Sequence, residues 1–210
     1  RHRTVIRSRV IDLALNQGRR ITAKIPTILA AYARLRDGND PIDPKPELSH
    51  AANFLYMLNG EEPSQVAEET FDMALILHAD HGFNASTFTS LVIASTLADM
   101  YNSITGGIGA LAGPLHGGAN QDVMDVLFEM DESELSAAEW IEQAIENDRR
   151  IPGWGHRVYK VKDPRAVILE SKLAELSEDS GETKWYRYTT TIEEYLTEEA
   201  EYVVQPEGSE

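Results

Sequence analysis

The sequence predicts an all-α fold, and three observations support this prediction. Apolar residues recur at helical spacing, as they do between Arg20 and Arg36. Residues that begin and end helices, such as Ser49 and the Asn59-Gly60 pair, lie between the periodic segments. No segment alternates apolar and polar side chains as a half-buried strand does. With 210 residues, of which 42% are hydrophobic, the chain is long enough to bury a core.

The expected helices follow one another along the chain with short breaks. The first spans residues 20–36 and is followed by a loop at 39–46, whose three prolines exclude regular structure. The later helices are expected at 49–58, 64–81, 87–101, 119–128, 136–147, 164–178 and 191–202. The glycine-rich stretch 105–118 predicts close contact between helices and a turn at Gly113-Pro114. Residues 151–156 are expected to form a loop.

The composition excludes several classes of function. The net charge is −16, from 35 acidic and 19 basic residues, which argues against nucleic acid or an anionic membrane as partner. The absence of cysteine excludes disulfides, thiolate catalysis and cysteine-ligated metal. Without a long apolar run or a signal pattern, a cytoplasmic protein is expected. An acidic chain with only six lysines favours adaptation to high salt, and an ordinary acidic protein is the alternative.

The charges are unevenly distributed. Residues 1–36 hold nine basic residues and one acidic residue, residues 37–148 hold one and 21, and residues 149–165 hold six and one. The simplest interpretation of the last cluster is a solvated turn paired with acidic neighbours. Because this cluster also contains proline, glycine and a histidine in a loop, it favours an anion-binding site.

Four of the six histidines lie in or beside segments that contain glycine or asparagine, where backbone groups can approach a ligand. A lone loop histidine is more often structural, but several together favour a functional site. His116 follows a turn and precedes a helix, whose positive end favours an uncharged imidazole that can polarise a carbonyl. His156 lies in a basic loop that leads to Arg165, whose guanidinium could grip a carboxylate through two hydrogen bonds.

The remaining two of these histidines, His78 and His81, lie three residues apart with Asp80 between them. A metal site there is disfavoured because no third histidine lies nearby and zinc usually takes three protein ligands. Core packing is expected for His78. His81 and Asn84, at the end of the helix, are better placed to meet a ligand.

Three motifs, in this order, resemble those of the citrate synthase family: HADHGFNAST at 78–87, GALAGPLHGGAN at 109–120 and PGWGHRVYKVKDPR at 152–165. The resemblance covers roughly residues 21–200 and is greatest to bacterial and archaeal forms. The 2-methylcitrate synthases share these motifs. The resemblance implies a large and a smaller helical domain with the active site in the cleft between them. The expected boundaries are 1–113 for part of the large domain, 114–203 for the small domain and 204–210 for a frayed acidic tail.

The resemblance implies an acyltransferase that converts acetyl-CoA, oxaloacetate and water to citrate and CoA in the tricarboxylic acid cycle. His116 would hydrogen-bond the acetyl-CoA carbonyl as its enol forms, and His156 would polarise the oxaloacetate carbonyl. Arg165 and His81 would hold oxaloacetate carboxylates, with Asn84 as a further substrate-binding residue. The resemblance implies a homodimer and no metal or cofactor. The basic residues near the coenzyme A phosphates would be Arg157, Lys160 and Lys162.

Two ends of the chain depart from the family pattern. The family's proton-abstracting base is an aspartate in an Asn-Val-Asp segment, and the last residues, EEAEYVVQPEGSE, contain no match. The opening RHRTVIRSRVIDLALNQGRR also differs from the family's N-terminal segment. We therefore expect an internal piece of the enzyme that tends to self-associate through uncovered apolar surface. Two hypotheses remain: an acyltransferase completed by a second polypeptide, and a non-catalytic helical remnant.

Overall fold

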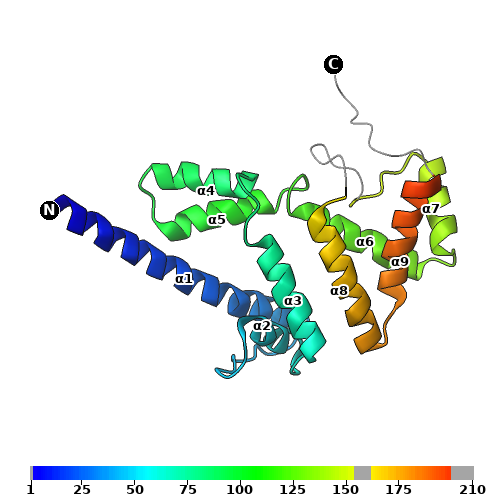
Figure 1. The fold of residues 1–210 in the computed structure, drawn as a ribbon, viewed down its shortest axis with the longest axis horizontal. Helices are drawn as coiled ribbons and strands as arrows, with labels where there is room; N and C mark the ends of the chain where they lie inside the picture. Colours follow the sequence, from blue (N-terminus) through cyan, green and yellow to red (C-terminus); the bar gives the residue numbers. More distant parts are fainter. Residues whose placement is uncertain (1, 154–161, 200–210) are drawn as a thin grey trace, which may run out of the picture. The chain divides into compact units, whose positions relative to one another are not determined.

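The computed structural model describes residues 2–153 and 162–199, and every regular element among them is helical (Figure 1). The predicted all-α fold is confirmed. The chain separates into two compact units, residues 1–108 and residues 109–210, so the break falls near the end of the fifth helix. In the described part of the chain, no helix combines the length and the apolar character needed to cross a membrane.

The first unit begins with the long helix α1 (His2–Arg36). The sequence predicted this helix only from residue 20, whereas in the structure it already starts at His2. Nothing between residues 2 and 17 breaks a helix, and Gly18 lies inside it, where its carbonyl accepts a hydrogen bond from the Thr22 hydroxyl at 3.1 Å. Pro26 also lies inside this helix. Ala30, which is 1% exposed, marks the part of α1 that packs against the rest of the unit.

Capping residues determine both ends of the next helix, α2 (His50–Asn59). Ser49 is its N-cap and accepts a hydrogen bond from the Ala52 backbone at 3.1 Å. Gly60 ends this helix with a φ of 88°, a conformation that favours glycine. Asn53 on α2 binds both backbone groups of Lys45 and so anchors the proline-rich loop. Both helix ends agree with the sequence prediction.

The third helix, α3 (Gln65–His78), packs against α2. Ser64 caps it, and the rings of Phe54 and Phe71 stack with their centres 5.0 Å apart across the two helices. The helix ends at His78, three residues before the predicted end. The Ala79 N–H bonds the Ile76 carbonyl there, which tightens the last turn.

The single helix predicted at 87–101 is wrong, because the structure has two helices there. These are α4 (Ala85–Ser95) and α5 (Met100–Leu111), separated by Leu97 with a φ of 66°. Asp99 then accepts a hydrogen bond from the Asn102 backbone at 2.9 Å and starts α5. The Asp99 signal is visible in the sequence, whereas the left-handed leucine is not, because leucine rarely adopts that conformation.

Glycines bring α5 close to α4, as the sequence predicted. A Cβ at Gly106 would collide with the Ile93 side chain, and one at Gly107 would collide with Ser90. Gly107 is buried. The absence of side chains at these two positions therefore sets how closely the helices approach.

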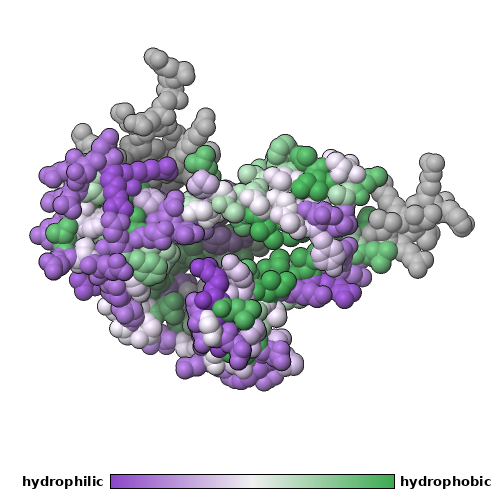
Figure 2. All heavy atoms as spheres, turned by 180° about the vertical axis from the view of Figure 1, so that it is seen from behind, coloured by the Kyte–Doolittle hydropathy of each residue, from purple (hydrophilic) through white to green (hydrophobic). Residues whose placement is uncertain are grey.

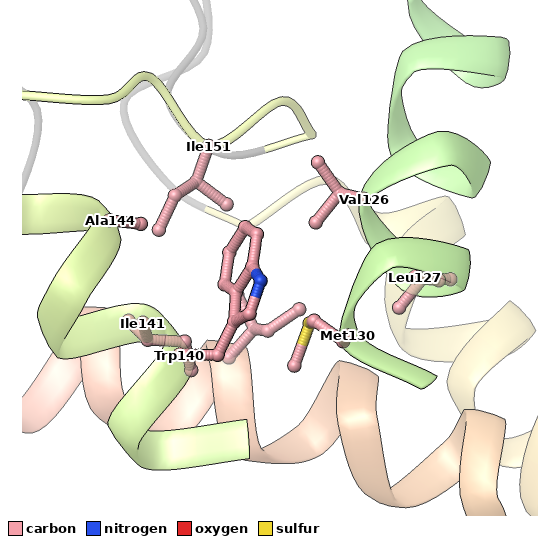
Figure 3. Packing of buried hydrophobic residues seen from close by; sticks show 8 residues of the cluster. Val126, Leu127, Met130, Trp140, Ile141, Ala144 and Ile151 are labelled. Atoms are coloured by element: carbon pink, nitrogen blue, oxygen red, sulfur yellow. The ribbon is translucent and has the colours of Figure 1, made fainter. Parts of the chain in front are cut away.

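The second unit contains α6 (Gly118–Glu132), α7 (Ala137–Glu146), α8 (Pro164–Ser180) and α9 (Lys184–Glu194), which continues into a π-helical turn at Tyr195–Glu199. Its core gathers around Trp140 of α7, which is 6% exposed (Figure 3). Figure 3 shows the indole between Ile151 and the α6 residues Val126 and Met130. Ile141 is fully buried beside it. Helix α7 starts where the sequence predicted it, and the structure shows a capping box between Ser136 and Glu139 at this start.

The last helix starts seven residues before the predicted position, at Lys184 rather than residue 191. Trp185, Tyr188 and Ile192 lie at helical spacing and pack on the same core as Trp140. The run of three threonines at 189–191 has a low intrinsic preference for helix, and core packing outweighs this preference. The hydroxyls of Thr189 and Thr190 bond carbonyls in the preceding turn.

Candidate functional site

His81 lies in a tight turn between α3 and α4 of the first unit. The carboxylate of Asp80 accepts a hydrogen bond from the Gly82 backbone at 2.7 Å, and Gly82 has a φ of 60°. This turn leaves the His81 side chain exposed. Asn84 follows at the N-cap of α4, where its Oδ1 accepts from the Thr87 backbone at 3.0 Å. The two residues predicted to meet a substrate in this unit thus lie on one short segment.

His78 lies at the end of α3 and is exposed, so the core packing predicted for it is wrong. Its Nδ1 lies 2.6 Å from the Ala74 carbonyl oxygen of its own helix. Within residues 2–153 and 162–199, no three histidine, aspartate or glutamate side chains are grouped as metal ligands.

His116 lies in the turn that leads into α6, as the sequence predicts. Its backbone N–H donates to the Gly113 carbonyl at 3.0 Å, and its own carbonyl accepts from Ala119 at 3.2 Å. His116 therefore stands two residues before the first residue of a 15-residue helix, near its positive end. The side chain is half-buried.

Two glycines make this turn possible. A Cβ at Gly117 would lie 2.7 Å from the Leu111 carbonyl oxygen, and one at Gly118 would lie 2.9 Å from the Gly113 carbonyl oxygen. Both distances are shorter than real Cβ contacts, and backbone atoms cannot move aside as flexible side chains can. The position of His116 thus depends on the absence of side chains at the next two residues.

Arg165 lies in the first turn of α8, next to the aspartate that caps the helix. Asp163 accepts a hydrogen bond from the Arg165 backbone N–H at 2.9 Å. The same carboxylate accepts from the Arg165 Nε at 3.1 Å and from Nη2 at 2.6 Å. Pro164 lies at the first helical position, where its fixed φ suits the helix. The start of this helix at residue 164 was predicted from the sequence, whereas the ion pair between Asp163 and Arg165 was not.

Lys162 precedes this cap and lies between two carboxylates of the second unit. Its Nζ is 2.6 Å from Glu170 of α8 and 2.5 Å from Glu193 of α9. The hydrogen bonds to these two glutamates raise the pKa of Lys162. The resemblance implied a phosphate contact for this lysine, and neither glutamate was predicted as its partner; Glu193 is 31 residues away in the chain.

The structure therefore groups the candidate residues in two places. His81 and Asn84 belong to the first unit, and His116, Lys162 and Arg165 belong to the second. In the second unit, His116 precedes α6 and Arg165 lies in the first turn of α8, and an imidazole and a guanidinium can each hydrogen-bond carbonyl or carboxylate oxygens. Three predicted residues lie outside the described part of the chain: His156, Arg157 and Lys160.

Comparison with known proteins gives these residues a context. The family described as "Citrate synthase, C-terminal domain" matches residues 7–207. The citrate synthase of Haloferax volcanii is 55% identical over 188 residues, which cover 90% of this chain and 50% of the relative. The 2-methylcitrate synthase 1 of Corynebacterium glutamicum is 40% identical, with 85% of this chain and 48% of the relative covered.

A solved structure agrees with these relatives. It is the ternary complex of carboxymethyl coenzyme A and oxaloacetate with citrate synthase from Thermoplasma acidophilum, which is 34% identical and has a TM-score of 0.73. The likeness covers 83% of this chain and 46% of that one. The chain thus spans about half the length of the curated relatives it matches. The match over residues 7–207 and the fold together show that this chain belongs to the citrate synthase family.

Proposed function

We propose that the protein containing this chain is a citrate synthase, which condenses acetyl-CoA with oxaloacetate and hydrolyses the resulting thioester to citrate and CoA. The observation that carries this proposal is the 55% identity to the Haloferax volcanii citrate synthase over 90% of the chain. His116 and Arg165, each near the start of a helix, carry an imidazole and a guanidinium. These groups can hydrogen-bond the carbonyl and carboxylate oxygens that this reaction involves. The ternary complex of the Thermoplasma relative contains oxaloacetate and a coenzyme A derivative.

In this proposal, His116 donates a hydrogen bond to the thioester carbonyl of acetyl-CoA while a carboxylate base removes a methyl proton. The enol carbon then attacks the ketone of oxaloacetate, which His156 polarises. Arg165 and His81 bind the oxaloacetate carboxylates, and Asn84 is a further substrate-binding residue. Lys162, Arg157 and Lys160 would bind the phosphates of coenzyme A. The reaction needs no cofactor beyond its two substrates.

A second candidate is 2-methylcitrate synthesis from propanoyl-CoA. The 40% identity to a Corynebacterium 2-methylcitrate synthase supports it, because the two reactions differ only by one methylene group on the acyl chain. A single methylene in an apolar pocket is worth only about 10- to 200-fold in discrimination. The higher identity to the Haloferax citrate synthase favours acetyl-CoA.

The proposal extends to a homodimer in the cytoplasm that is adapted to salt and serves the tricarboxylic acid cycle. Support for self-association comes from a concentration of exposed apolar residues over α4 and α5 (Figure 2). These include Phe83, Phe88, Leu91, Val92, Tyr101 and Ile108, each at least 49% exposed. Support for salt adaptation comes from the net charge of −16 and the Haloferax relative.

A thiol-release assay tests the catalytic proposal. Purified chain is mixed with oxaloacetate and acetyl-CoA in high salt, and His116→Ala is compared with His78→Ala. His78 is the matched control because it is exposed and has no role in the proposed chemistry. Turnover that His116→Ala abolishes and His78→Ala retains supports the proposal. No turnover by a folded wild-type chain would favour the non-catalytic hypothesis for this chain.

Sedimentation velocity tests the dimer. Phe88→Asp places a charge in the exposed apolar area of α4 and is expected to shift a dimer toward monomer. Val167→Asp on α8 is the control, since Val167 is similarly exposed, at 54% against 53% for Phe88. A wild-type chain that sediments as a monomer at every concentration would contradict the proposal.

A further inference from the structure

We propose that Asp80 is a positioning residue that holds His81 in place for a substrate carboxylate. This inference rests on the proposed function, in which His81 binds oxaloacetate. Residues 79–84 form the short connection between α3 and α4 of the first unit (Figure 1). Within this connection, Oδ1 of Asp80 accepts a hydrogen bond from the Gly82 N–H at 2.7 Å.

This hydrogen bond closes a ring around the His81 backbone. The ring runs from the Asp80 carboxylate through the backbone of residues 80 and 81 to the Gly82 N–H. It therefore restricts the φ and ψ angles of His81, which set the direction in which the imidazole leaves the chain. Aspartate and asparagine commonly form such turns, because their side-chain oxygen reaches the backbone N–H two residues later.

The helical hydrogen bonds end before His81 and begin again after it. The last turn of α3 closes with the Ala79 N–H, which bonds the Ile76 carbonyl at 3.1 Å. Bonding in α4 begins with the Phe88 N–H, which bonds the Asn84 carbonyl at 2.9 Å. The His81 side chain is exposed, so its position depends on the local chain more than on burial.

The far end of the connection is held by a separate set of contacts. Asn84 caps α4 by accepting from the Thr87 N–H at 3.0 Å. Phe83, the residue before the cap, packs edge-to-face on Phe88, the fourth residue of α4, with ring centres 5.4 Å apart. Such a pair fixes the angle at which the chain enters a helix. Loss of the bond within the turn should therefore disturb His81 while α4 keeps its start.

Gly82 supports the same turn through its backbone angle. Its φ is 60°, in the left-handed region that glycine and asparagine tolerate and β-branched residues avoid. A Cβ at this position would meet nothing within 4 Å, so a substitution here acts through the backbone and not through a collision. Gly82→Asn and Gly82→Val therefore form a pair in which valine opposes the turn much more strongly.

The alternative is that the Asp80 carboxylate only repels the carboxylates of the substrate. Removal of the charge would then tighten binding in every variant. Asp80→Asn separates the two roles, since it loses the charge but keeps an oxygen that can accept from the Gly82 N–H. Asp80→Ala loses both. Positioning predicts that asparagine restores what alanine loses, whereas repulsion predicts the same gain in both variants.

Binding of oxaloacetate by the full chain, measured by calorimetry, tests the proposal. We expect the dissociation constant to rise about fivefold in Asp80→Ala, because a hydrogen bond that restrains the turn is lost, and to stay within about twofold of wild type in Asp80→Asn. Gly82→Val is expected to weaken binding and Gly82→Asn to preserve it. Asp72→Ala is the matched control, since Asp72 is an exposed aspartate on α3 outside the turn.

A second readout follows the turn directly. In chain labelled with ¹⁵N-glycine, the Gly82 amide signal is identified by its absence in Gly82→Asn. Its exchange with solvent should be faster in Asp80→Ala than in wild type, and Asp80→Asn should restore the slow exchange. Affinity for coenzyme A is expected to stay unchanged in all these variants, because the residues proposed to bind its phosphates belong to the second unit.

The outcomes are distinct. Weaker oxaloacetate binding and faster Gly82 exchange in Asp80→Ala, both restored in Asp80→Asn, support the positioning role. Equal binding by folded Asp80→Ala and wild-type chains, or tighter binding in both Asp80 variants, overturns it and leaves the proposed function intact. Equal binding by Gly82→Val and Gly82→Asn would likewise overturn it. A folded wild-type chain that binds no oxaloacetate contradicts the proposed function for this chain, and the positioning role fails with it.

Discussion

The guanidinium of Arg149 binds the carboxylate of Glu129 through two parallel hydrogen bonds, both 2.6 Å long. The pair joins α6 to the segment after α7, and Arg149 also lies 4.9 Å from the centre of the Trp140 ring. The hydrogen bond from Arg149 lowers the pKa of Glu129. Arg149 begins the basic cluster 149–165, so part of that cluster stabilises the second unit rather than meeting a ligand.

The stability from this pair is expected to depend on pH. A folded-state pKa below the ordinary value stabilises the protein above the glutamate pKa of about 4.3, and this stability is lost as pH falls through the lowered pKa. A double-mutant cycle with Glu129→Gln and Arg149→Met is expected to give a coupling of about 0.5 kcal/mol at pH 7, because both groups are nearly half exposed and screened by solvent. Urea unfolding between pH 3 and pH 7 measures this coupling energy. A coupling that persists at low pH would contradict the assignment.

The core of the second unit is expected to be sensitive at Ile141, which is fully buried. Ile141→Ala should reduce the free energy of unfolding by about 2–5 kcal/mol, and Ile141→Val by about 0.5–1.5 kcal/mol, because the surrounding side chains only partly fill the cavity. Urea unfolding measures both. Val167→Ala is the control, since Val167 is 54% exposed and should change stability by less than about 0.5 kcal/mol. Equal effects at the two sites would show that the core is not packed as described.

The turn that carries His116 is expected to reject a side chain at Gly117. Gly117→Ala places a Cβ 2.7 Å from the Leu111 carbonyl oxygen, so the turn must shift and displace His116. We expect lower stability and, if the chain turns over, a loss of activity of about 100-fold, because small displacements of catalytic groups are costly. Gly109→Ala is the matched control, since a Cβ there meets nothing within 4 Å. Unchanged activity in Gly117→Ala would contradict this prediction.

The two carboxylates on Lys162 are expected to weaken any phosphate contact that it makes. Replacing Glu170 and Glu193 by glutamine removes the charges that pair with Lys162, so affinity for coenzyme A should rise at low salt. Calorimetry measures this affinity. Glu175→Gln is the control because Glu175 lies on the same helix and pairs with Lys172 instead. If the double variant and the control bind coenzyme A equally, Lys162 has no part in that site.

Salt is expected to stabilise the chain, because screening reduces the self-repulsion of a net charge of −16. The thermal unfolding midpoint should rise as potassium chloride increases from about 0.1 M to molar concentrations, where the Debye length falls to about 3 Å. Circular dichroism at 222 nm follows the transition. A midpoint that does not change with salt would make this an ordinary acidic protein.

Local chemistry was sufficient to predict most of the helix ends. Ser49, Ser136 and Asp163 cap their helices through hydrogen bonds to residues two or three positions away. Such short-range contacts can be predicted from the sequence. The turn before α6 and the placement of His116 at its start were predictable for the same reason. The missed break between α4 and α5 depends on a left-handed Leu97, which no local preference indicates.

Contacts between distant segments could not be predicted in this way. The start of α9 depends on Trp185 and Tyr188 packing on the core around Trp140, and this packing outweighs the weak helix preference of the threonines. The pairing of Lys162 with Glu193 likewise exists only because α8 and α9 lie together. The chain's order of residues thus specified the helix starts that a neighbouring side chain caps, such as those after Ser49, Ser136 and Asp163. Long-range packing selected the partners of side chains such as Lys162, because apolar burial is non-directional and its energy depends on the whole set of neighbours.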